Sequence, residues 1–137
     1  MLANKAKLAY KTTGSTFIEL SGLKEIPEVG EDVEKVENSS LDASVKTYEK
    51  GVGDAPELAY KFKYNNNATD SPYRVLRKLA DDGTTVDFKE TLVDGTTTTF
   101  SGQVSIKRTG GALNDVLEFT MTVLLSTALT ITDPVIA

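Results

Sequence analysis

The residue types that most often carry out chemistry in enzymes are scarce in this sequence. It contains no cysteine and no histidine, which excludes thiolate nucleophiles, zinc–thiolate sites, histidine bases and the hydrolytic triads built on them. Serine and threonine are plentiful, but without histidine their hydroxyls would need a lysine as general base. We therefore expect a protein that is not an enzyme and that holds no cofactor.

Several carboxylates gather between residues 25 and 37. Paired carboxylates can catalyse glycoside hydrolysis or bind Ca²⁺. The spacing of these acids matches no calcium loop, and Lys24 and Lys35 are interleaved with them. We interpret the segment as a solvated acidic face that meets a partner, with Glu28, Glu31 and Asp32 as its contact residues. A catalytic or metal site is the weaker alternative.

Glycine-containing motifs are also present, and each has a simple structural explanation. Asp82-Gly83 and Asp94-Gly95 are typical of turns, and the alternative is that either pair forms half of a metal site. Gly51-x-Gly53 and Gly110-Gly111 lack both the strand–glycine–helix context and the lysine of a phosphate-binding loop. We interpret the glycines of all four motifs as turn or loop residues.

Charge and hydropathy narrow the class of protein further. A net charge of −5 argues against a duplex-DNA reader, because such proteins neutralise phosphates with clustered lysine and arginine. The first eleven residues, MLANKAKLAYK, lack the apolar stretch of a secretory signal. The longest aliphatic run, residues 123–125, is far too short to cross a bilayer. We expect a soluble protein made in the cytoplasm, with no membrane partner.

The elements that would position these residues are mostly strands. Eighteen threonines favour a pleated backbone, since β-branched side chains lose rotamer freedom in helices. In residues 57–64 four large residues share one face, which we interpret as core in preference to a platform for stacking nucleic-acid bases: Leu58, Tyr60, Phe62 and Tyr64. Further strands are predicted at 16–20, 33–38, 84–93, 96–108, 117–125 and 127–131, with a turn or edge at 24–30.

A single helix is predicted over residues 70–81. Asp70-Ser71-Pro72 supplies a side-chain cap followed by proline at the first helical position, and Gly83 ends the helix. Tyr73, Leu76 and Leu79 recur at helical spacing and should anchor it. The layout predicts one domain, residues 1–137, that is mainly β: a β-sandwich or partly closed β-barrel with one flanking helix.

Residues 40–56 have no clear strand or helix pattern, yet they carry apolar side chains. Leu41, Val45, Tyr48 and Val52 are spaced through them. A long loop in a small domain is usually functional or disordered, and the apolar side chains of this one argue against disorder. We predict that it is an assembly loop, with subunit contacts at Leu41, Asp42, Val45, Lys46, Tyr48, Val52 and Asp54. The alternative is a loop folded onto its own core.

A basic N-terminal arm, residues 1–15, complements the acidic segment. Its lysines are Lys5, Lys7 and Lys11. Opposite patches on one small chain allow a head-to-tail contact, which closes into rings or continues into a filament. A short C-terminal tail, residues 133–137, follows the last predicted strand.

From about residue 17 to residue 130 the sequence resembles the major tail proteins, or tail tube proteins, of long-tailed non-contractile bacteriophages. The resemblance rests on the order of several short motifs: Ile26-Pro27-Glu28-Val29-Gly30, Glu34-Lys35-Val36-Glu37, Ser40-Leu41-Asp42, Lys46-Thr47-Tyr48, Gly51 with Asp54, and Leu58-x-Tyr60-x-Phe62-x-Tyr64. The family pattern has threonine where this chain has Ser40, which is a chemically mild difference.

The resemblance implies a structural virion protein, assembled in the bacterial host cytoplasm and located in the virion tail. Its copies would form homohexameric rings that stack into a tube around a tape-measure protein, with tail terminator and distal tail proteins as further partners. DNA would pass through the lumen without specific binding, and a negative lumen would let it slide.

Two other functions remain open from sequence. The first is an inner tube subunit of a contractile or type VI secretion-like system, which shares the implied fold. The second is a carbohydrate-binding β-sandwich module. Such modules generally present exposed tryptophan or tyrosine on a flat face, and this chain contains no tryptophan.

Overall fold

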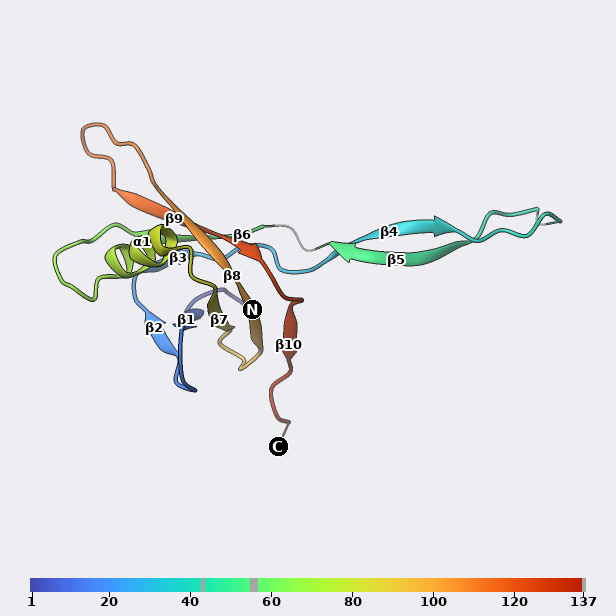
Figure 1. Ribbon diagram of the computed structural model, residues 1–137, viewed down its shortest axis with the longest axis horizontal. Coiled ribbons are helices and arrows are strands. Elements are labelled where there is room, and N and C mark those ends of the chain that lie inside the picture. Colours follow the sequence, from blue (N-terminus) through green and yellow to red (C-terminus); the bar gives the residue numbers. More distant parts are fainter. Residues whose placement is uncertain (43, 55–56, 137) are drawn as a thin grey trace.

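The structure, a computed structural model, describes residues 1–42, 44–54 and 57–136. In that part of the chain, eight strands and one helix form a folded body, and two further strands form a long hairpin that projects from it (Figure 1). The elements are β1 (Lys7–Lys11), β2 (Ile18–Leu20), β3 (Leu23–Glu25), β4 (Asp32–Glu37), β5 (Tyr48–Asp54), β6 (Leu58–Lys63), α1 (Pro72–Asp82), β7 (Val86–Thr91), β8 (Thr97–Arg108), β9 (Glu118–Leu125) and β10 (Thr130–Thr132).

The body is one antiparallel sheet of eight strands, as far as the described residues show. Seven of them follow the order β2-β1-β7-β8-β9-β6-β3, and β10 also pairs with β8. The strands at the two ends of this order, β2 and β3, do not pair with each other, so the sheet is not closed. The helix α1 packs against the sheet at β8. The prediction of a mainly β fold with one flanking helix is confirmed.

The core lies on one face of this sheet, where alternating residues of neighbouring strands meet. Phe62 of β6 pairs in register with Phe119 of β9, and their rings stack with centroids 5.2 Å apart. Tyr73 of α1 meets the ring of Phe119 edge-on at 5.3 Å. The remaining fully buried side chains come from the same strands, from β1 and β7, and from Leu76 of the helix. The predicted core face of β6 is therefore confirmed.

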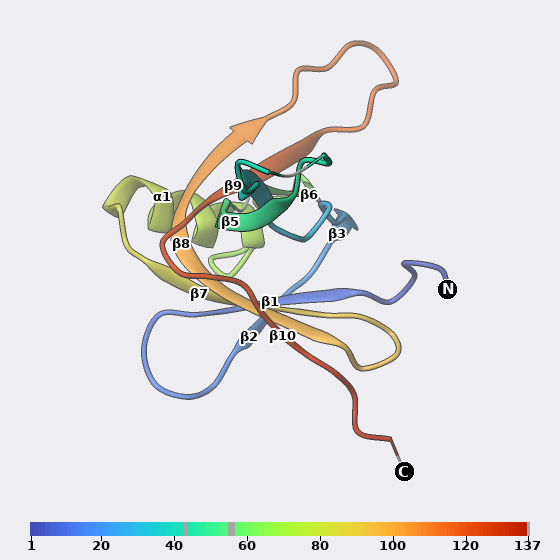
Figure 2. The same cartoon turned by 90° about the vertical axis from the view of Figure 1, so that its right-hand side faces the viewer.

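The strand β8 is curved (Figure 2), and it pairs with β7 along its first part and with β9 along its second part. Gly102 pairs with Val86 of β7 on one side and with Leu125 of β9 on the other. A Cβ at this position would lie only 2.2 Å from the carbonyl oxygen of Leu124, so no other residue fits without moving the backbone. Glycine here permits the close approach of β9 where the two pairings meet.

The helix α1 begins and ends close to the predicted positions. Pro72 is its first residue, and Gly83 ends it in the left-handed conformation with φ of 66°. The predicted side-chain cap is wrong, because the Ser71 hydroxyl accepts a hydrogen bond from the Ala68 N–H, at 3.1 Å, and makes none to the helix. Leu76 is buried, and Tyr73 and Leu79 pack against the core as expected.

Of three expectations about irregular segments, one is met and two need correction. The predicted turn or edge at 24–30 begins within β3, a short strand at the edge of the sheet. The predicted arm, residues 1–15, contains β1, which lies between β2 and β7 and buries Leu8 completely in the core. The predicted loop, residues 40–56, contains β5, since residues 48–54 pair with β4. Residues 43, 55 and 56 of that loop, and residue 137 of the predicted tail, lie outside the described residues.

One carboxylate lies inside the body. Glu90 of β7 occupies a core-facing position and is 4% exposed. The hydroxyl of Tyr60 donates a hydrogen bond of 2.5 Å to its Oε2. Burial raises the pKa of Glu90, while this hydrogen bond lowers it in part. Burial, together with the charge of Glu90, also raises the pKa of Tyr60. The pair joins β6 to β7, strands that do not neighbour each other in the sheet.

Candidate assembly interface

The β4–β5 hairpin occupies the connection between β3 and β6, which are themselves antiparallel neighbours in the sheet. Its register runs from Asp32 opposite Asp54 at the base to Glu37 opposite Tyr48. An irregularity near Gly51 interrupts the ladder, and a Cβ there would lie 2.9 Å from the Glu34 carbonyl oxygen. The hairpin extends away from the body, so its strands contact one another rather than the sheet (Figure 1).

Both faces of the hairpin are open to solvent. Every residue of β4 is exposed, and so is every residue of β5 except Gly51, which is half-buried. Apolar side chains share this exposure, which reaches 84% at Val52 and 109% at Leu41. Val33, Val36, Val45 and Tyr48 are exposed as well. An isolated two-stranded hairpin is at best marginally stable in water, and burial of these side chains would need another surface.

The charges along the hairpin do not favour its strand pairing. Asp32 lies directly opposite Asp54, and Lys35 lies directly opposite Lys50. Like charges at directly opposed positions destabilise an antiparallel pair. One partial compensation is the Lys35 ammonium, which lies 5.7 Å from the centre of the Tyr48 ring. The hairpin's own cross-strand pairs therefore give it little stability.

Hydrogen bonds fix the point where the strands give way to the tip. The Asn38 N–H donates to the Thr47 carbonyl at 2.8 Å, and the Thr47 hydroxyl donates back to the Asn38 carbonyl at 2.5 Å. The Thr47 N–H donates to the Ser39 hydroxyl oxygen at 2.9 Å. Beyond this clamp, Leu41 and Asp42 are exposed on one side of the tip, and Val45 and Lys46 on the other. A hydrogen bond from the Ser40 hydroxyl lowers the pKa of Asp42, so its carboxylate stays charged.

The predicted contact residues fall into two groups in space. Ten of them lie on the hairpin or at its base: Glu28, Glu31, Asp32, Leu41, Asp42, Val45, Lys46, Tyr48, Val52 and Asp54. The Glu31 carboxylate approaches Gly53 at the hairpin base. Lys5, Lys7 and Lys11 lie on the body, where Lys11 is 3.9 Å from the Asp87 carboxylate and 4.8 Å from the centre of the Phe17 ring. Among the described residues, no ion pair joins these three lysines to Glu28, Glu31 or Asp32.

Enzymatic and metal sites find no support in the part of the chain that the structure describes. The sequence has one Ser-x-x-Lys spacing, at Ser21 and Lys24, but the Lys24 ammonium is paired with the Glu118 carboxylate at 2.7 Å. This ion pair engages the Lys24 ammonium with a carboxylate, so nothing in the structure indicates that it serves a serine nucleophile as general base. Within the described residues no group of three or more acidic side chains is arranged to hold a metal ion. The described helix is not long and apolar enough to span a membrane.

Sequence comparison decides the family. A family model described as "Phage tail tube protein, TTP" matches residues 8–134, which is nearly the whole chain. The chain belongs to the phage tail tube protein family. No curated protein matches the chain. The family resemblance seen in the sequence is confirmed, and membership makes the chain a structural component of the phage tail rather than an enzyme.

Solved structures with the same fold include chains from gene transfer agent particles and from the anti-feeding prophage. A chain in the tail of an empty GTA particle, refined with C6 symmetry, has a TM-score of 0.73 at 20% identity and covers 96% of this chain and 98% of its own. A chain in the six-fold symmetrised baseplate of the anti-feeding prophage has a TM-score of 0.73 at 11% identity, and the match covers 97% of this chain and 95% of the other. A chain in the virion of a native gene transfer agent particle has a TM-score of 0.65 at 19% identity, and the match covers 91% of this chain and 95% of the other.

One surface of this tail tube subunit could not be recognised from sequence. Arg74 and Lys78 of α1 flank a groove between the helix and the segment after β1, near Thr12. The sequence gives no sign that Tyr10 and Thr12 lie beside these cations. The groove depends on contacts between residues more than sixty positions apart in the chain.

Proposed function

We propose that this tail tube subunit self-assembles into hexameric rings that stack into a tube, and that the β4–β5 hairpin carries the contacts. The observation that supports this most directly is the exposure of apolar side chains on both faces of a hairpin that has no core of its own. Removing each such side chain from water would contribute about 1.5–3 kcal/mol when burial is complete. A second copy of the chain is the surface that would bury them.

Sixfold symmetry is supported by two of the solved structures that share this fold. Two of the similar solved chains come from particles treated with C6 or six-fold symmetry, in a tail and in a baseplate. Membership of the tail tube family favours a phage tail over the secretion-system inner tube and over the carbohydrate-binding module. The head-to-tail contact implied by a single projecting hairpin is heterologous, so it can close into a ring or continue along a tube.

The proposed tube conducts DNA without binding it specifically. The chain carries a net charge of −5, and the hairpin strands with their tip, residues 32–54, hold six acids against three lysines. A negative wall repels the phosphate backbone, whereas a basic wall would retain it. Further partners on this proposal are a tape-measure protein inside the tube and terminator and distal tail proteins at its ends, with assembly in the host cytoplasm.

Negative-stain electron microscopy of the concentrated wild-type protein tests the proposal. We expect rings of six subunits and tubes built from them, and addition of sulfate should promote both, because excluded salts strengthen apolar burial. Rings with another number of subunits would contradict the sixfold arrangement. A protein that stays monomeric at every concentration and salt condition would contradict self-assembly.

A further inference from the structure

A groove of about 640 Å³ lies along one side of α1. Its apolar lining comes from Val75 and Leu79 of the helix and from Tyr10 of β1. Arg74, Lys78 and Asp82, one helical turn apart along the same flank, supply its charged side chains. Three threonines complete the lining: Thr12, Thr69 and Thr84. The groove therefore combines an apolar lining with two positive charges and one negative charge.

These charges are free to meet a partner. Among the ion pairs of the described residues, none involves Arg74, Lys78 or Asp82. The guanidinium of Arg74 is instead held in place by Asn66, donating to its side-chain oxygen at 2.8 Å and to its backbone carbonyl at 3.1 Å. A pre-positioned guanidinium loses little freedom when it binds a carboxylate.

The tip of the hairpin carries the complementary set. Leu41 is fully exposed and stands next to Asp42, whose carboxylate is ionised. Lys46 follows on the returning side of the tip. The tip thus presents two exposed apolar side chains, Leu41 and Val45, together with one negative charge and one positive charge within six residues. The signs match those of the groove: a carboxylate for Arg74 and Lys78, and an ammonium for Asp82.

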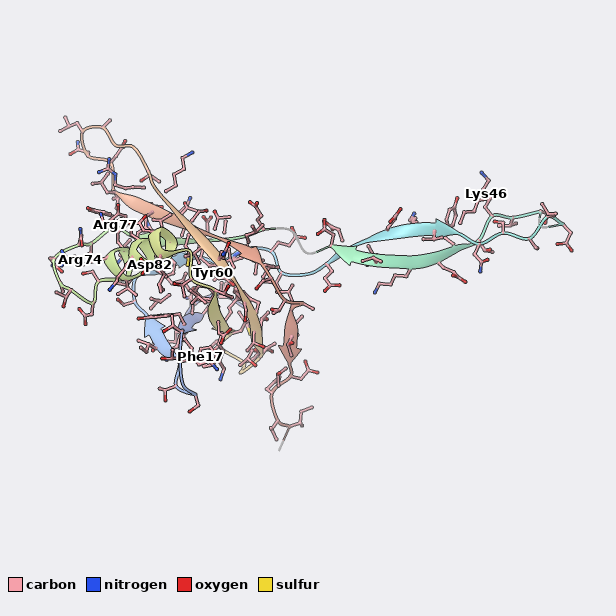
Figure 3. The ribbon with its side chains drawn as sticks, in the orientation of Figure 1. Phe17, Lys46, Tyr60, Arg74, Arg77 and Asp82 are labelled. Carbon is pink, nitrogen blue, oxygen red and sulfur yellow. The ribbon has the colours of Figure 1, made fainter. Side chains whose placement is uncertain are left out.

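The tip cannot reach the groove of its own chain. Figure 1 shows α1 in the body and the hairpin tip at the far end of the long axis of the molecule. Figure 3 shows the same separation for the labelled side chains, with Lys46 near the tip and Arg74, Arg77 and Asp82 beside the helix. An occupant drawn from this protein must therefore come from a second copy.

We propose that the hairpin tip of one subunit inserts into the α1 groove of another, with Leu41 against Tyr10, Val75 and Leu79. Asp42 then pairs with Arg74 and Lys78, and Lys46 pairs with Asp82. This inference rests on the proposed self-assembly and adds its receiving surface. Because tip and groove lie far apart on the subunit, the contact is heterologous, and each subunit that donates a tip can also receive one.

Engineered cysteines test the contact directly, because the natural chain has none to form background disulfides. We expect the double variant Leu41→Cys/Thr12→Cys to form a ladder of disulfide-linked multimers under oxidising conditions. A disulfide requires Cα atoms within roughly 4.4–6.8 Å, so the ladder would report close approach. The matched control is Leu41→Cys/Ser105→Cys, since Ser105 is also exposed but lies on β8 away from the groove.

Mixing the two single variants, Leu41→Cys and Thr12→Cys, separates the possible contacts. A heterologous contact links one subunit of each kind and gives dimers only in the mixture. Dimers of Leu41→Cys alone would instead indicate tip-to-tip pairing and overturn the proposal. A ladder as strong in the Ser105 control as in the Thr12 variant would overturn it as well.

A charge swap provides the second readout. We expect Asp42→Lys and Lys78→Glu each to reduce the sedimenting tube fraction several-fold, and the combination to restore most of it. Both positions are exposed, so the variants should fold normally. If wild-type tubes form but neither substitution affects them, the groove is the wrong receiving surface while self-assembly stands. If the wild type forms no tubes, the proposed function itself fails.

Discussion

The body and the hairpin of this subunit differ in how far their side chains are buried. In β6 and β9 the large side chains alternate strictly, and Phe62 and Phe119 are completely buried against each other. In β4 and β5 no residue is buried, and Asp32 faces Asp54. Burial therefore explains why the body folds, whereas nothing within one chain explains why the hairpin carries exposed valines and leucine. The difference supports the proposal that the body serves folding and the hairpin serves assembly.

The largest expected effect contrasts one aromatic residue from each region. Phe62→Ala should lower the free energy of unfolding by about 3–5 kcal/mol, because it leaves a cavity beside Phe119. Tyr48→Ala should change it by no more than about 0.5 kcal/mol, since the Tyr48 ring is exposed. Chemical denaturation of the unassembled subunits measures both. A cost at Tyr48 comparable with that at Phe62 would break the contrast.

A smaller effect concerns Glu90, the one buried carboxylate of the body in the described residues. Because burial raises its pKa in the folded state, the folded chain keeps a proton that the unfolded chain releases. Its contribution to stability is fully present below the ordinary value of 4.5 and is lost as the pH rises through the raised folded value. As the pH rises through this range, the free energy of unfolding of the wild type should therefore fall relative to that of Glu90→Gln.

The measurement for Glu90 is a series of denaturation curves from acid to neutral pH. The glutamine variant keeps an oxygen that accepts the Tyr60 hydrogen bond and removes the titration. The two free energies of unfolding should differ most in favour of the variant at neutral pH. A difference that does not change with pH would show that Glu90 does not titrate in this range.

The smallest effect sharpens the account of the hairpin. Lys50→Glu replaces a like-charge pair with Lys35 by an opposite-charge pair, which is worth about 0.2–1 kcal/mol across antiparallel strands. We expect slower hydrogen exchange at the backbone amides of β4 and β5, with no change in β6 or β9. Slower exchange in the body strands would mean that the hairpin and the body unfold together.

Sequence predicts the body far better than it predicts the hairpin, for a physical reason. A strand with one buried face must alternate, so β6 and β9 were predictable, and Pro72 and Gly83 marked the helix ends. The strand β5 has no buried face to impose alternation, and its glycines resemble a loop. Its pairing with β4 could not be inferred from residues 48–54 alone.

The proposed interface was likewise predictable only in part. The apolar residues of the tip were recognisable because they stood outside any core pattern. The α1 groove was not, since Tyr10 and Val75 come together only through the sheet order that places β1 in the body. Glu90 was hidden for a related reason: a carboxylate at a core-facing position contradicts the pattern and is tolerated only because Tyr60 reaches it. Long-range packing, rather than local pattern, determines both.

The most direct test of the division between folding and assembly is to replace residues 32–54 with a short glycine–serine turn. The junction is suitable because β3 and β6 are antiparallel neighbours, and Ile26 and Val29, which pack on the core, are retained. We predict a free energy of unfolding within about 1 kcal/mol of the wild type, because the hairpin buries none of the core. We predict no tubes by electron microscopy under conditions in which the wild type forms them. A shortened chain that unfolds, or one that still builds tubes, would contradict the account.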